Sequence, residues 1–170
     1  MNLKWIGAVL IITGCTLTGF SFSAAYRREE RDLQQLISAL DFMACELQFR
    51  KSPLPELCYQ AGAQRKGCIG TIFRNLAKEL ESQVSPDVQS CLAIAAATSG
   101  HLSARIQEAV CILGSSLGRF DLEGQLLGLE AVRSYCKSQL EEMSQGREAR
   151  LRSYQTLGLC AGAALAILFV

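Results

Sequence analysis

The chain has 170 residues, and its 17 lysines and arginines nearly balance its 16 aspartates and glutamates, giving a formal net charge of +1. This balance lacks the basic excess of a nucleic-acid-binding protein. All acidic residues and all but one basic residue lie in residues 27–152, so this segment is formally neutral and suits one small domain with a modest core.

The first element is an uncharged stretch of 22 residues, 5–26, with the sequence WIGAVLIITGCTLTGFSFSAAY. As a helix it would extend about 33 Å, enough for a hydrocarbon core of roughly 30 Å. Arg27, Arg28 and Arg31 follow it directly. Because positively charged flanks stay cytoplasmic, the sequence predicts an N-terminal transmembrane helix, residues 1–26, with residue 27 onward in the cytoplasm.

Two other interpretations of this stretch stay open. Ser23–Ala25 could be the small-residue cleavage site of a signal peptide, which would leave Tyr26 as the mature terminus. Ile12–Cys15 resembles a lipoprotein cleavage box, although the run after it stays apolar through Phe22. The sequence does not decide whether the N-terminal segment is ever cleaved.

The cysteines favour a reducing compartment. None lies within nine residues of another and most fall on apolar helical stripes, which is typical of cysteines that act as small hydrophobic residues. No Cys-x-x-Cys pair occurs, so the sequence predicts no metal site and no cofactor. The eight are Cys15, Cys45, Cys58, Cys68, Cys91, Cys111, Cys136 and Cys160.

The middle segment has a helical apolar period throughout. The first helix would continue from the anchor. Ser52 is expected to cap a second helix whose first position is Pro53, with Gly62 and Gly67 bracketing its end. The predicted buried positions are Leu36, Leu40, Leu47, Leu76, Leu92, Ile106, Leu113, Leu129 and Leu140.

Cap signals predict the later helices. Ser85–Asp87 would begin one and Ser103 another, which would end at Gly118 in a left-handed turn. Asp121 is expected to cap the last helix. No strand-like alternation occurs, so the expected fold is all-α, an antiparallel bundle of about six helices.

The last helix would run into a second uncharged stretch, residues 153–170, preceded by arginines at 147, 150 and 152. Its strictly apolar part, residues 157–170, would extend only about 21 Å. Whether it spans fully stays open, and a C-terminal core helix is the alternative. Gly158, Gly162 and Ala166 recur every four residues and would let another helix approach closely.

The sequence predicts no enzyme. The only histidine, His101, falls between two predicted helices, as a loop or cap residue would. Gly62–Gly67 has the glycine spacing of a phosphate loop, but Cys68-Ile69 replaces the lysine and hydroxyl residue that hold phosphate and magnesium. We interpret it as an interhelical turn, and we expect no catalytic residue and no small-molecule substrate.

The order and spacing of several segments carry a resemblance. These are Ser52–Leu57 (SPLPEL), Leu113–Asp121 (LGSSLGRFD) with Gln125 four residues on, and Leu157-Gly158 in the closing anchor. Together with the N-terminal anchor they resemble the stage III sporulation protein AB family of endospore-forming bacteria. That family in turn resembles the cytoplasmic helical domain of the platform protein F of type II secretion systems.

The resemblance implies a membrane-anchored scaffold of the sporulation channel between mother cell and forespore, in the mother-cell membrane around the forespore. By analogy with the secretion platform, its helical domain, residues 27–152, would contact a cytoplasmic ATPase. Expected structural-turn or partner-contact residues are Pro53, Leu54, Gly118, Asp121 and Gln125. An exported or lipid-anchored helical binding protein is the alternative.

Overall fold

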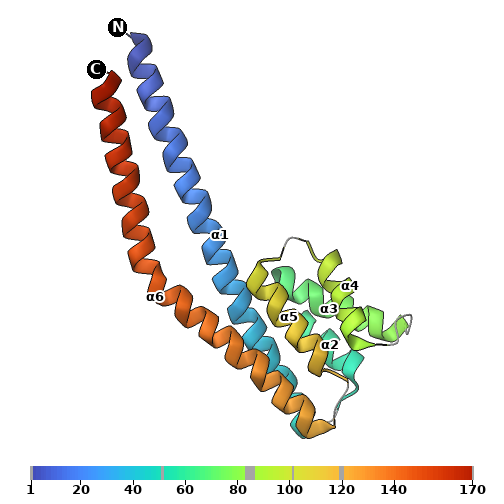
Figure 1. Ribbon diagram of the computed structural model, residues 1–170. Coiled ribbons are helices and arrows are strands. Elements are labelled where there is room, and N and C mark those ends of the chain that lie inside the picture. The colour runs from blue at the N-terminus through green and yellow to red at the C-terminus, as the bar shows by residue number, and fades with distance from the viewer. Residues whose placement is uncertain (1, 51, 83–86, 101, 119–120, 170) are drawn as a thin grey trace. The chain divides into compact units, whose positions relative to one another are not determined.

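The computed structural model describes residues 2–50, 52–82, 87–100, 102–118 and 121–169, with side chains described between residues 24 and 145 of these ranges. Within these ranges the chain forms helices and no strand, which confirms the all-α prediction. The six helices, shown in Figure 1, are α1 (Asn2–Phe49), α2 (Leu54–Ala63), α3 (Gly67–Ser82), α4 (Val88–Thr98), α5 (Ala104–Ser116) and α6 (Leu122–Phe169).

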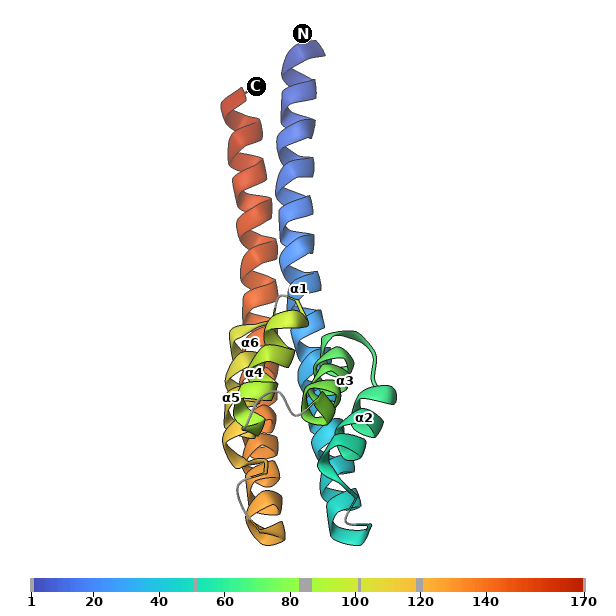
Figure 2. The ribbon, with the colours of Figure 1, turned by 90° about the vertical axis from the view of Figure 1, so that its right-hand side faces the viewer.

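The chain divides into two compact units. One comprises the chain up to Arg28 and from Glu141 onward, and the other comprises Glu29–Leu140. In the first unit the N-terminal part of α1 and the C-terminal part of α6 run side by side in opposite directions (Figures 1 and 2). The Tyr26 hydroxyl donates a hydrogen bond of 2.6 Å to the Met143 carbonyl and so joins the two helices.

Among the described residues, no helix combines the length and the apolar character that crossing a membrane requires. Apart from residues 24–26, the side chains of the two expected anchors are not among those described, and Gly158, Gly162 and Ala166 belong to the part that is not described.

The core of the Glu29–Leu140 unit follows the predicted helical stripes. Eight of the nine predicted positions are buried, from Leu36 on α1 to Leu129 on α6. Leu140 was predicted to be buried, and this prediction is wrong, because its side chain is only half-buried. It is the last residue of the unit, and the buried residues of α6 are instead Leu129, Val132, Cys136 and Met143.

Three of the predicted caps and turns are confirmed. Ser103 Oγ accepts a hydrogen bond from the Ile106 backbone N–H at 3.4 Å, and Asp121 Oδ1 accepts one from Gly124 N–H at 3.0 Å. Both bonds satisfy donors that a helix start leaves without partners. Gly118 has a φ of 76°, in the left-handed region.

The start of α2 differs from the prediction. Pro53, and not Ser52, is the N-cap residue, with a ψ of 143° and no side-chain cap. This extended ψ keeps Pro53 out of the helix, so α2 begins one residue later, at Leu54. For α4 the N-cap is Asp87, while Ser85 and Pro86 lie outside the described residues.

The glycine-flanked segment is an interhelical turn, as predicted. Gly62 lies in the last turn of α2, and Gly67, with a φ of 78°, is the first residue of α3. Cys68, which directly follows the segment, lies in the first turn of α3, since the left-handed Gly67 completes the reversal and lets the helix begin at once. A helix and not a strand precedes the segment, so it lacks the setting of a phosphate loop.

Candidate functional site

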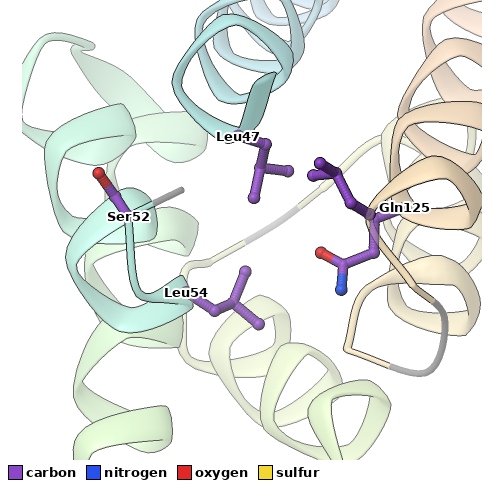
Figure 3. A pocket seen from close by; sticks show the side chains of 5 residues that line it. Leu47, Ser52, Leu54 and Gln125 are labelled. Atoms are coloured by element: carbon purple, nitrogen blue, oxygen red, sulfur yellow. The ribbon is translucent and has the colours of Figure 1, made fainter. Parts of the chain in front are cut away.

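A cavity of about 350 Å³ opens where α1 ends and where α2 and α6 begin. In Figure 3 the side chains of Leu47, Leu54 and Gln125 converge on it from these three helices. Ser52 and Leu122 complete its lining. The site is therefore mostly apolar, with the amide of Gln125 as a polar group that can orient a bound side chain.

Local structure at the helix ends holds the cavity in place. Leu47 is the last buried residue of the α1 stripe, at 7% exposure, and Leu54 follows the Pro53 cap as the first residue of α2. On α6, the Gln125 N–H donates to the Asp121 carbonyl at 2.9 Å, within the first turn that Asp121 caps. The cavity thus depends on where α2 and α6 begin.

Large apolar side chains are exposed close by in the sequence. Phe49 follows Leu47 by two residues and is 77% exposed, and Leu127 follows Gln125 by two residues and is 68% exposed. Leu122, in the cavity lining itself, is 38% exposed. Single exposed apolar residues are ordinary, and residues two apart on a helix point to different sides, so Phe49 and Leu127 are not part of the cavity lining.

The structure brings together the predicted site residues to different degrees. Leu54 and Gln125 share the cavity, and a Cβ atom on Gly118 would lie 4.0 Å from Leu54 Cδ2. Pro53 and Asp121 act as the N-caps of α2 and α6. The role of these five residues as a partner contact stays a prediction.

Sequence reasoning missed Leu47 and Leu122 as members of the site. Leu47 was predicted only as core, because its helical stripe continues the buried positions of α1. Leu122 was predicted only as the start of the α6 stripe. An apolar residue directly after a cap was the available signal, but the sequence could not show that three helix ends meet.

The turn between α5 and α6 accepts only glycine at residue 118. Beyond its positive φ of 76°, a Cβ atom there would lie 2.6 Å from Val88 Cγ2. Real Cβ atoms do not approach other atoms this closely. The turn therefore packs directly on the start of α4. This contact fixes the position of the turn near Leu54, which lines the cavity.

A buried arginine connects α2 to α1. Arg65, 8% exposed, lies between α2 and α3 and donates to the Ala61 carbonyl at 2.9 Å, to the Ser38 carbonyl, and to Ser38 Oγ at 3.2 Å. Its guanidinium carbon lies 5.6 Å from the centre of the Phe42 ring, within cation-π range. Burial lowers the pKa of Arg65, and the charge of Asp41 opposes this shift. The arginine ties α2 to the middle of α1.

Two ion pairs join α1 to the later helices. Arg133 Nε on α6 lies 2.6 Å from Asp41 Oδ1, and Arg105 Nη1 on α5 lies 3.2 Å from Glu29 Oε1. Arg105 Nε also donates to Gln139 Oε1 at 2.8 Å, which links α5 to α6. All four charged groups are partly exposed, so each pair contributes only about 0 to 1 kcal/mol to the free energy of unfolding. The pairs act mainly by aligning the helices.

The part of the chain that the structure describes holds no metal-ligand cluster. No group of three or more histidine, cysteine, aspartate or glutamate side chains in this part could hold a metal ion. Burial raises the pKa of the Cys58 thiol to about 12 and that of Cys136 to about 11, so neither forms the reactive thiolate near neutral pH. His101 lies outside the described residues.

A family model described as stage III sporulation protein AB matches residues 4–170. The chain belongs to this family. The match confirms the resemblance that the segments around Ser52–Leu57 and Leu113–Asp121 carried, and it supports a role in sporulation.

Two individual proteins agree with this assignment. Stage III sporulation protein AB of Bacillus subtilis (strain 168) is 24% identical over 172 residues, covering 99% of each chain. A solved structure of a stage III sporulation protein AB superposes with a TM-score of 0.63 at 17% identity, covering 72% of this chain and 98% of that one. At this identity the structural likeness supports the fold alone.

Proposed function

We propose that the chain is a membrane-anchored scaffold of a sporulation-specific, secretion-like channel complex between mother cell and forespore. Its place is the mother-cell membrane around the forespore, with the helical domain in the cytoplasm and other stage III sporulation proteins as partners. The observation that carries the proposal is the charge pattern: two uncharged terminal stretches, each bordered by three arginines on the side of the same helical domain. Membership of the sporulation family supplies the setting.

The length of the two uncharged stretches and the charges beside them support the two anchors. Residues 5–26 are long enough to span, and Arg27 and Arg28, at the start of the domain, are exposed. Residues 153–170 form the shorter anchor, and the small-residue row Gly158, Gly162 and Ala166 would let it pack closely against another helix in lipid.

The cavity at the start of α2 and α6 is the proposed contact for the cognate cytoplasmic ATPase. Its apolar lining of Leu47, Leu54 and Leu122 suits an apolar side chain of the partner, and such buried anchors dominate the affinity of protein interfaces. A partner bound there would touch three helices at once. Motion of the ATPase would then reach both long helices, α1 and α6, which continue toward the anchors.

Thiol labelling tests the topology. In intact cells a membrane-impermeant maleimide is expected to leave the chain unlabelled, and after permeabilisation it should label the exposed Cys45 and Cys111. Peptide mapping by mass spectrometry identifies the labelled residues. Cys68 is a poorer reporter, because burial, and then the nearby Asp32, raise the pKa of its thiol to about 11.

The matched control is Cys111→Ser, which should remove only the Cys111 label. Labelling of Cys111 in intact cells, or processing of the chain at Cys15 or after Ala25, would contradict a cytoplasmic domain between two anchors. Either result would favour the exported or lipid-anchored binding protein instead.

A further inference from the structure

The two long helices are tied together twice where they leave the Glu29–Leu140 unit. Within this unit, Arg105 at the start of α5 contacts both helices: its Nη1 lies 3.2 Å from Glu29 Oε1 on α1, and its Nε donates to Gln139 Oε1 on α6 at 2.8 Å. Within the terminal unit, the Tyr26 hydroxyl on α1 donates to the Met143 carbonyl on α6 at 2.6 Å. Each of the two compact units therefore has its own polar tie between α1 and α6.

These two ties bracket one turn of each long helix. Tyr26 and Glu29 are three residues apart on α1, and Gln139 and Met143 are four residues apart on α6, against about 3.6 residues in a helical turn. The boundary between the two units falls within both bracketed turns, and the backbone is helical through both. A motion of one unit against the other needs to change only these two turns.

The bracketed turn of α6 is easier to deform than that of α1. On α1 the turn contains the good helix formers Arg27 and Arg28. On α6, Ser144 directly follows the turn, and its Oγ donates to the Glu141 carbonyl at 2.8 Å. A serine that bonds back to a carbonyl of the preceding turn slightly destabilises a helix and often bends it. Gly146, two residues further on, adds backbone freedom.

The Tyr26 hydroxyl holds the backbone of this deformable region. Its acceptor, the Met143 carbonyl, directly precedes Ser144, and Met143 is buried, with 3% of its surface exposed. If α6 bends here, this carbonyl changes direction and the bond to Tyr26 is lost, because hydrogen bonds weaken steeply away from a linear geometry. One hydrogen bond shifts an equilibrium by only about twofold to tenfold, so this tie is reversible.

We propose that the turn of α6 from Gln139 to Met143 is a hinge between the two compact units, and that the Tyr26 hydroxyl holds this hinge in its closed state. Arg105 gives the hinge a fixed base, since it binds both long helices on the other side of the turn. The hinge lets the Glu29–Leu140 unit turn against the terminal helices without unfolding of either unit. It requires neither the membrane anchors nor the ATPase contact proposed above.

The test is a distance measurement by double electron–electron resonance on the full-length chain in detergent. One spin label is attached to Ala24→Cys, at an exposed position of the terminal unit, and the other to the native, exposed Cys111 on α5. With Tyr26 intact, one distance should dominate. Tyr26→Phe, which removes only the hydroxyl, should raise the population at other distances about twofold to tenfold. The cysteines replaced by serine in this experiment are Cys15, Cys45, Cys68 and Cys160.

Tyr135→Phe is the matched control. The Tyr135 hydroxyl also donates a hydrogen bond, to Glu108 Oε2 at 2.6 Å, but both residues lie within the Glu29–Leu140 unit. Its loss should leave the distances between the two labels as in the wild type. Ser144→Ala removes the serine bond and adds a better helix former, so it should narrow the distribution that Tyr26→Phe broadens.

Four results would overturn the proposal. An unchanged distribution in Tyr26→Phe would show that the hydroxyl does not hold a hinge, and equal broadening in Tyr135→Phe would indicate a general loosening of the helices. Broadening in Tyr26→Phe that Ser144→Ala does not reduce would place the flexible turn on α1 instead. Broadening between labels on Cys45 and Cys111, both within the Glu29–Leu140 unit, would show that this unit itself opens.

Discussion

Replacing Gly118 with valine is expected to lower the free energy of unfolding by about 2 to 5 kcal/mol. Two effects add. The φ of 76° is strained for a β-branched residue, and the new Cβ atom would lie 2.6 Å from Val88 Cγ2 on α4. The turn cannot relieve the first effect without moving the start of α6. Urea denaturation of the helical domain, residues 27–152, followed by circular dichroism, measures the loss.

Gly114→Ala is the matched control for this variant. Gly114 lies inside α5, and a Cβ atom there would lie 3.3 Å from Gln89 Cα and 3.3 Å from Leu92 Cδ2, so the neighbours need to shift only slightly. Gly114→Ala should therefore lower the free energy of unfolding clearly less than Gly118→Val does. Asp121→Ala, which removes the α6 cap, should cost about 1 kcal/mol. A Gly118→Val domain as stable as the wild type would show that the turn is placed wrongly.

Truncation of Leu76 to alanine is expected to lower the free energy of unfolding by about 2 to 5 kcal/mol, because it opens a cavity in the core of the domain. Leu76, on α3, has an exposed fraction of 0%. Leu140→Ala should cost less, since Leu140 is half-buried at the end of the unit. The exposed Leu127→Ala should change the stability by less than about 0.5 kcal/mol. Similar losses for Leu76→Ala and Leu127→Ala would contradict the core described here.

The sequence was sufficient to predict the helices because the apolar period and the caps agree. At Ser103 and Asp121 a side chain that can accept a backbone N–H bond directly precedes an apolar stripe, and both were confirmed as caps. At Ser52 the same signal was misleading, because the extended Pro53 takes the cap position. Local signals therefore predict that a helix begins, but a neighbouring proline shifts its first residue.

The candidate site was predictable only in part. The segments that carried the family resemblance contain Leu54 and Gln125, and the structure places both in one cavity. Their common lining with Leu47 depends on contacts between α1, α2 and α6, which a single sequence does not contain. Arg65 was overlooked for a related reason: a charged residue in a glycine-flanked turn is normally solvated, and its burial against Ser38 is a tertiary effect.

Recovery of the cognate cytoplasmic ATPase with the affinity-tagged full-length chain from sporulating cells tests the scaffold proposal most directly. Leu54→Asp places a charge in the cavity and should reduce the recovered ATPase at least about tenfold at an unchanged level of the chain. Gln125→Ala should weaken recovery in the same direction, and Tyr59→Asp, exposed on α2, should leave it unchanged. Wild-type recovery with Leu54→Asp, or no recovery with the unmodified chain, would contradict the account.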